Sequence, residues 1–177
     1  MGSSVSTKTE FNFQQENIDF IQKNFRSPFK FRMTLLSRLP MGFLSGMKVR
    51  ELNQESCKVE VRYKWLNKNP FRSMFWAVLG MAAEMSSGAL LIMYTYKQKP
   101  SIATLVTATS ATYHKKAVGK ITFVCNSGKE IAAAVAQTAI SFEPVEVVCP
   151  MTGFNEAGEV VAKFSFTWSL KARKPKI

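Results

Sequence analysis

The sequence predicts an α+β fold in which a curved, mostly antiparallel sheet wraps around one long apolar helix. Helical spacing in the first 40 residues gives way to a series of segments with alternating apolar and polar residues. Short polar turns join most of these segments, which favours antiparallel pairing. One long apolar segment interrupts the series, and a helix that is apolar on all sides is typically buried against a sheet. The length of 177 residues suits one such domain.

The N-terminal part, residues 1–40, is predicted as a helical segment that precedes an α+β domain over residues 41–177. Apolar spacing predicts a first helix over residues 13–24, and Ser27-Pro28 resembles an N-cap followed by proline at the first helical position. The second helix continues to about residue 39. Phenylalanines alternate here with lysine and arginine. We expect these helices to pack on the sheet or on a second subunit; peripheral contact with an anionic membrane surface is the alternative.

The first two strands and the long helix follow. Residues 47–51 and 59–65 alternate with period two, and the polar residues 53–56 between them predict a hairpin. The long apolar helix is predicted over residues 73–94. Because it lies between two strands of one sheet, we expect it on the concave face.

The remaining chain supplies four strands and a short helix. Strands are predicted over 102–113, 120–126, 145–151 and 159–170, and an alanine-rich helix over 129–140. A turn at Asn155-Glu156-Ala157-Gly158 joins the last two strands.

Residues 74–93 have the hydropathy of a membrane span. Glu84 lies at the centre of this segment, where a charge is unfavourable in lipid, and Ser86, Ser87 and Gly88 follow it. Both flanks lead into strand-like sequence. We therefore predict a helix buried in the protein and no transmembrane segment.

Composition excludes several chemistries. Lysine and arginine number 24 against 12 acidic residues, giving a net charge of +12, while His114 is the only histidine and Asp19 the only aspartate. A histidine-rich zinc site cannot be built, and no Gly-x-Ser-x-Gly, G-x-G-x-x-G or Walker A pattern occurs. The charge suits CoA phosphates, an anionic membrane or non-specific nucleic-acid binding. No nucleic-acid recognition module is found.

The three cysteines are Cys57, Cys125 and Cys149. Their odd number and the lack of a C-x-x-C pair favour buried thiols in a reducing compartment, so we expect a cytoplasmic location. The first ten residues are polar, without a signal peptide. Residues 1–6 fit an N-myristoylation pattern, and a plain polar start is the alternative.

Glu84 is the only acidic residue between Glu60 and Glu130, a stretch that holds ten lysines and arginines. A carboxylate in so apolar a helix is unfavourable unless it is paired or protonated. Such a residue either has a hidden partner or is kept for chemistry.

Two motifs resemble those of hotdog-fold thioesterases, in particular the phenylacetyl-CoA thioesterase type. Asn69 precedes Glu84 by fifteen residues, as an asparagine precedes the catalytic acid in that family. The segment Asn155–Ala162 is similar to the family's turn between the last two strands. The resemblance covers about residues 40–170. Phe75-Trp76-Ala77 stands where the family has His-Gly-Gly, so the chain resembles a separate branch.

The resemblance implies hydrolysis of an acyl-CoA thioester. The carbonyl would accept a hydrogen bond from the Trp76 N–H at the helix N-terminus, and Glu84 would act as general base or nucleophile. Eight residues separate Trp76 and Glu84, so we expect both on the same side of the helix. Ser87 would hold the water, or else merely allow close packing. Asn69 would fix the loop at the helix start, or else serve as a turn residue.

The same resemblance implies the remaining site residues and the partners. Phe71, Phe75 and Met81, with Trp76, would line an acyl pocket. Lys115 and Lys116 would meet CoA phosphates. His114 is a candidate for hydratase chemistry or a surface residue.

The resemblance also implies a homodimer or dimer of dimers, with the ligand site between subunits and no cofactor or metal. Acyl carrier protein is an alternative carrier to CoA. The alternative function is a non-catalytic protein that binds acyl groups, lipid or acyl-CoA.

Overall fold

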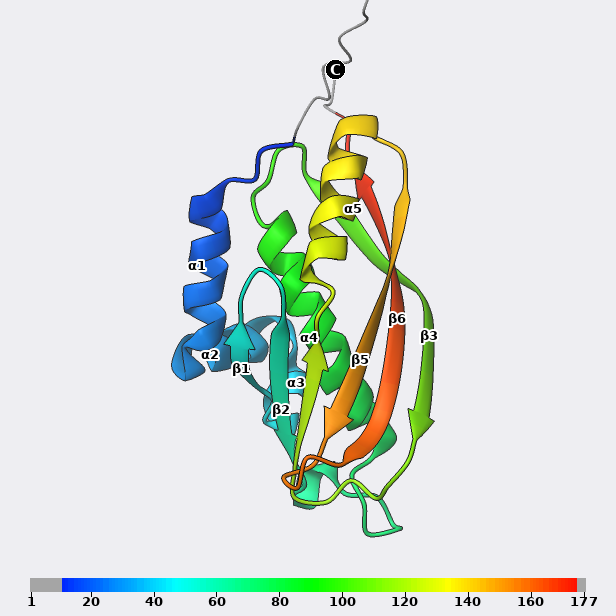
Figure 1. Cartoon of the computed structure of the whole chain (residues 1–177). Helices are drawn as coiled ribbons and strands as arrows, with labels where there is room; N and C mark the ends of the chain where they lie inside the picture. The colour runs from blue at the N-terminus through cyan, green and yellow to red at the C-terminus, as the bar shows by residue number, and fades with distance from the viewer. Residues whose placement is uncertain (1–10, 175–177) are drawn as a thin grey trace, which may run out of the picture.

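A computed structural model describes residues 11–174 of the chain (Figure 1). The helices are α1 (Gln15–Arg26), α2 (Pro28–Arg38), α3 (Pro40–Ser45), α4 (Trp76–Thr95) and α5 (Gly128–Ser141), with a short 3-10 helix η1 (Trp65–Asn67). The strands are β1 (Lys48–Leu52), β2 (Cys57–Arg62), β3 (Ile102–Tyr113), β4 (Lys120–Cys125), β5 (Val145–Phe154) and β6 (Val160–Ala172). They form one sheet in the order β1-β2-β4-β5-β6-β3, and every neighbouring pair is antiparallel. The predicted α+β class is confirmed.

The long helix α4 is packed against the sheet, as the sequence predicts. It contacts β2, β4, β5 and β6, and its buried residues join the inward side chains of the strands in one core. By length and composition α4 could cross a membrane, yet 56% of its most apolar window is buried inside the fold. Its apolar character is therefore used in the core of the protein.

The two edge strands of the sheet differ in chemistry. β1 has five residues, three of them charged, and α1 and α2 lie beside it (Figure 1). β3 has twelve residues with no charged side chain, and it pairs only with β6 among the described strands. Natural proteins usually protect a long edge strand with charges, bulges or a covering element. Of these devices β3 has only a register shift between Val106 and Ala108.

The N-terminal helices share the core of the sheet domain. Their buried residues are Ile18, Ile21, Phe25, Phe31 and Leu35. These side chains pack toward β1 and α4, so one apolar core continues across residue 40. The division of the chain at residue 40 remains a prediction.

Pro40 begins a helix that the sequence analysis missed. The second helix was expected to end near residue 39 with no helix directly after it, whereas Pro40 occupies the first turn of α3, a position that tolerates proline because its missing N–H has no helical partner. α3 ends at Ser45, and the next residue, Gly46, has a φ of 76°, the left-handed conformation that glycine favours.

The second strand is shorter than predicted. It ends at Arg62, and Trp65 lies in η1. The buried side chain of Asn67 donates hydrogen bonds to Ser45 O (2.9 Å) and Arg62 O (2.8 Å). These bonds bend the chain after β2 into the loop that leads to α4.

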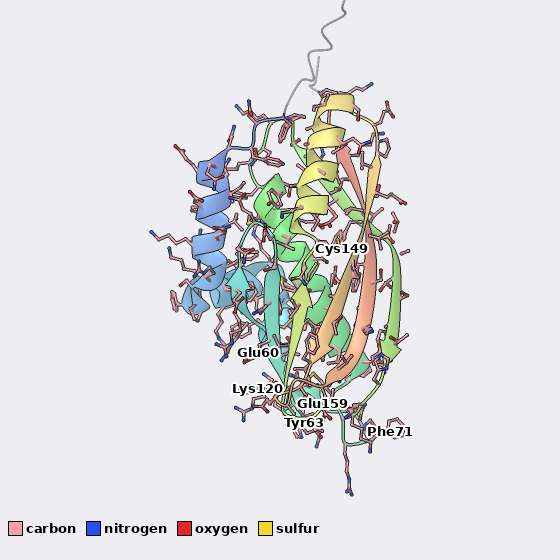
Figure 2. The ribbon with its side chains drawn as sticks, in the orientation of Figure 1. Glu60, Tyr63, Phe71, Lys120, Cys149 and Glu159 are labelled. Carbon is pink, nitrogen blue, oxygen red and sulfur yellow. The ribbon has the colours of Figure 1, made fainter. Side chains whose placement is uncertain are left out.

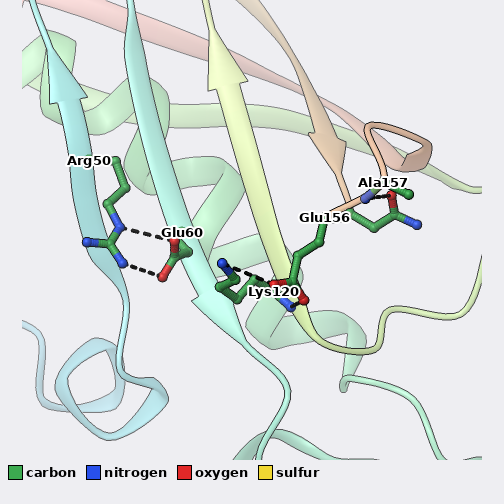
Figure 3. A network of polar contacts seen from close by, with 6 residues as sticks. Arg50, Glu60, Lys120, Glu156 and Ala157 are labelled. Atoms are coloured by element: carbon green, nitrogen blue, oxygen red, sulfur yellow. Dashed lines mark hydrogen bonds and ion pairs between the residues drawn. The ribbon is translucent and has the colours of Figure 1, made fainter.

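Ion pairs link neighbouring segments on the outer face of the sheet (Figure 3). Arg50 on β1 forms two hydrogen bonds with Glu60 on β2, at 3.1 and 2.7 Å, and holds the pKa of that carboxyl below its usual range. Lys120 at the start of β4 pairs with Glu156 in the turn between β5 and β6, at 3.0 Å. That turn is the predicted one: Asn155 Oδ1 accepts from Ala157 N and Glu159 N.

Gly128, the first residue of α5, lies against the backbone of the β1–β2 hairpin, where its N–H donates to Glu55 O. A Cβ atom at Gly128 would lie 2.1 Å from Gln54 O, a contact that only backbone movement can relieve. We predict that Gly128→Ala lowers the free energy of unfolding by about 1–3 kcal/mol in urea titrations. Gly80→Ala is the matched control, because Gly80 lies within α4 with room for a methyl group and should gain up to about 1 kcal/mol. Equal effects of the two substitutions would contradict this description of the packing.

Candidate active site

The side chain of Glu84 lines a cavity of about 230 Å³ beside α4. Met81, Met85, Gly88 and Ile92 of α4 line it, with Leu39 before α3, Thr104 of β3 and Trp168 of β6. The walls are mostly apolar, and Glu84 is the only ionisable residue among those that line the cavity.

The Glu84 side chain is half-buried, and its carboxylate has neither an ion pair nor a hydrogen bond within residues 11–174. Burial in this apolar wall raises the pKa of the Glu84 carboxyl above its ordinary value. A carboxylate with a raised pKa is a better proton acceptor than an exposed one. The hidden partner that a structural glutamate would need is thus missing from the described residues.

Ser87 lies one turn after Glu84 but does not line this cavity. Its buried hydroxyl donates to Glu84 O (3.0 Å) and accepts a hydrogen bond from Trp168 Nε1 (3.0 Å). The hydroxyl therefore anchors the indole of β6 to α4. This geometry favours the structural alternative for Ser87 over holding a water.

Asn69 organises the loop before α4. The side-chain Oδ1 of Asn69 accepts hydrogen bonds from Phe71 N (2.9 Å) and Ser73 N (3.1 Å). The backbone N–H of Asn69 donates to Ser73 O (2.8 Å). Phe75 N donates to Asn67 O (2.7 Å) at the end of the same loop. Asn69 is thus placed where a residue that fixes the start of the helix must lie.

The first turn of α4 presents free backbone donors. Val78 and Leu79 both donate to Phe75 O, and no side chain caps the helix. Within residues 11–174 no hydrogen bond uses the N–H of Trp76 or Ala77. Together with the positive end of the helix dipole, these groups favour an oxyanion.

A second cavity of about 380 Å³ lies at this helix start. It brings together Asn69, Trp76, His114, Lys115 and Lys116, five residues that the sequence analysis considered. His114 is exposed, at the end of β3.

The lysines that were expected to meet CoA phosphates differ in their contacts. Lys115 Nζ already pairs with Glu159 at the β5–β6 turn, while no ion pair in the described part of the chain involves Lys116. Lys116 is therefore the freer of the two cations at the second cavity.

Trp76 and Glu84 lie in separate cavities rather than in one, unlike the expectation from their spacing. Eight residues of α-helix correspond to about 12 Å along the axis and a rotation of about 80°. The backbone positions of Trp76 and Glu84 are thus offset along and around α4, and the two residues line different cavities.

The predicted acyl-pocket residues are divided as well. Met81 lies beside Glu84, whereas Phe71 and Phe75 line neither cavity. Phe71, with 76% of its surface exposed, is on the outermost loop, at the lower end of the molecule in Figure 2.

Trp168 and Thr104 belong to the Glu84 cavity and were missed from the sequence, because nothing local in a strand tells which helix residue it will face. Gly88 and Ile92 could have been found, since they follow Glu84 by four and eight residues along a single helix face.

The three cysteines line neither of the two cavities. Cys57, Cys125 and Cys149 are all buried free thiols, as predicted, and burial raises the pKa of the Cys57 thiol. No group of three or more potential ligands that could hold a metal occurs among the described residues.

Comparison with solved structures places this architecture in a known class. A probable thioesterase of Pseudomonas aeruginosa superimposes with a TM-score of 0.70 at 18% identity, covering 85% of this chain and 99% of that one. A putative thioesterase of Shewanella oneidensis gives 0.65 at 10% identity, with 90% and 100% covered. A thioesterase of Haemophilus influenzae gives 0.60 at 11% identity, with 82% and 91% covered. These likenesses concern the fold.

The curved sheet around a central helix is thus the hotdog fold of thioesterase-like proteins, as the Asn69 and Asn155 motifs implied. Within this class the chain belongs to the family described as a domain of unknown function, DUF4442, which matches residues 31–170. No curated protein matches the chain by sequence.

The raised pKa of Glu84 predicts a pH-dependent stability. A carboxyl whose pKa is raised by folding favours the folded state fully below its unfolded pKa, and this contribution is lost as pH rises through the folded value. Glu84→Gln removes that loss. We therefore predict that the melting temperature of this variant exceeds that of the parent chain at pH 8. The difference should be only about 2 °C, because solvent in the open cavity screens the charge. The two should converge near pH 4. A parent chain that is the more stable of the two at pH 8 would contradict the burial of an unpaired carboxylate.

Proposed function

We propose that this protein hydrolyses acyl-CoA thioesters with Glu84 as general base or nucleophile. The observation that carries the proposal is a half-buried carboxylate with no partner in residues 11–174, in an apolar cavity of a thioesterase-like fold. An apolar cavity suits an acyl chain, and an unpaired carboxylate suits activation of water or direct attack on the thioester carbon.

The oxyanion that develops on the thioester would be stabilised at the start of α4. The N–H groups of Trp76 and Ala77 have no acceptor in the described structure, and Asn67 and Asn69 hold the preceding loop in place. A preorganised backbone donor does not depend on the His-Gly-Gly side chains of related enzymes. Phe75-Trp76-Ala77 therefore retains the donors while changing the side chains around them.

We infer that two copies of the chain build each site, since Trp76 and Glu84 of one chain line separate cavities. The uncharged edge of β3 is the surface on which a second copy would extend the sheet. A two-fold axis beside β3 brings both α4 helices to the same concave side, running in opposite directions. Glu84 of one copy then approaches the helix start of the other.

The assignment of substrate groups follows from the two cavities. The acyl chain would occupy the apolar space beside Met81, and the CoA phosphates would lie near Lys116 and, after release from Glu159, Lys115. An acyl carrier protein is the alternative source of the thioester. The reaction needs no cofactor, and the three buried free thiols support a reducing, cytoplasmic location.

A non-catalytic acyl-CoA or lipid binder is the second candidate. The observation that favours it is the exposed Trp76 at the helix start, where a bulky side chain faces the second cavity in place of the glycine of related enzymes. Such a protein would retain a bound acyl ligand without turning it over.

The experiment is a panel of acyl-CoA thioesters of different chain length, followed by release of the free thiol. We predict turnover that falls about 100-fold or more in Glu84→Gln, because removal of a general base or nucleophile has effects of this size. Glu143→Gln, at an exposed position outside both cavities, should leave the rate unchanged.

A bound acyl ligand in native mass spectra with no turnover on any chain length would favour the binding protein. Equal rates for the parent chain and Glu84→Gln would rule out Glu84 as the catalytic group.

A further inference from the structure

The outer face of α1 and α2 is apolar and basic, and no described residue covers it. α2 buries Phe31 and Leu35 in the core, yet its opposite side exposes Phe29, Met33 and Leu36, which follow the i, i+4, i+7 spacing of one stripe. The exposed fractions of these side chains are 73%, 40% and 50%. Single exposed apolar residues are ordinary, whereas a continuous stripe marks an interaction surface.

A groove of about 520 Å³ runs along this stripe, and we call it the N-terminal groove. Its lining includes Phe20 of α1, Phe29 and Met33 of α2, and Ile92 of α4, with Lys30 and Arg38 also in its wall. Ile92 also lines the Glu84 cavity, so the two hollows are neighbours on α4.

The charges around the groove have a single sign. Residues 20–50 contain seven lysines and arginines and no aspartate or glutamate. None of the ion pairs within the described chain involves a basic residue of α1, α2 or α3. The two acids of α1, Glu16 and Asp19, lie in the half of the helix that is farther from α2. The partner of this face must therefore be both apolar and anionic.

A second copy of the chain is a poor partner for this face. A two-fold contact would set the same patch against itself and bring the five lysines and arginines of α1 and α2 against five of the same sign. The face also lies at the β1 side of the molecule, across the sheet from β3, where we place the contact between copies (Figure 1). It thus stays free in the dimer that we propose.

We propose that this face docks on an anionic phospholipid surface. Phe29 and Met33 enter the boundary of the acyl chains while Lys30 and Arg38, with the other cations of α1 and α2, contact the headgroups. This proposal stands without any enzyme activity. If the proposed function also holds, an acyl thioester at the membrane reaches Glu84 from the side of Ile92, a consequence that rests on that function.

The test is flotation of the full-length, unacylated chain with vesicles. Phosphatidylcholine vesicles are compared with vesicles that also contain phosphatidylserine. We expect the protein to float with the anionic vesicles and to be released as NaCl is raised. Phe29→Ser should lower the partition coefficient about tenfold or more, and Lys30→Glu about fivefold or more.

Matched controls distinguish vesicle binding by this face from non-specific hydrophobic and electrostatic binding. Ile140→Ser replaces another exposed apolar residue, 47% accessible, on α5, and Lys163→Glu makes the same charge change on β6. Both should bind as the parent chain does, and all four variants should keep its melting temperature because the sites are exposed.

Absence of flotation with anionic vesicles overturns the proposal. So does an equal loss in the control variants, or a loss of dimers on sedimentation of Phe29→Ser, which would assign the face to a second copy. Because thioester hydrolysis is not measured, these outcomes are independent of the test of the proposed function.

Discussion

The burial of α4 against the concave face of the sheet is the constraint on which the rest of the molecule depends. The helix is apolar almost all round, so it is stable only where other side chains remove it from water. β2, β4, β5 and β6 supply that surface, and α1 closes part of the remaining side. The side that stays open carries the Glu84 cavity, and the burial on either side of it raises the pKa of that carboxyl.

The same constraint leaves the helix start free for chemistry. The side chain of Asn67 bends the chain after β2, and the turn at Asn69 delivers it to Trp76. The first N–H groups of α4 consequently lie at one end of the helix and Glu84 near its middle. A rise of about 1.5 Å per residue separates the backbone of Trp76 from that of Glu84 by about 12 Å along the axis, and the two residues line different cavities. This separation, more than any single side chain, is why our account of the site requires a second copy.

Much of the fold follows from local patterns in the sequence. β3 has the predicted bounds, and the turns at Asn53 and Asn155 form through their own side-chain oxygens. Pro40 was misjudged because proline either follows one helix or begins the next, and the local sequence does not decide between them. The isolation of Glu84 in an apolar helix marked it as a candidate. Its neighbour Trp168 could not be predicted, because the contact depends on how β6 packs on α4.

The central claim, that Glu84 of one copy acts with the helix start of the other, can be tested with a heterodimer. Trp76→Pro removes one N–H at a position where proline is tolerated, and it is co-expressed with Glu84→Gln under different affinity tags. Each homodimer should be nearly inactive on an accepted acyl-CoA. The purified heterodimer holds one intact site of two, so we predict roughly half of the parent activity. A heterodimer as inactive as both homodimers would contradict the account, because it would place both groups of each site in one chain.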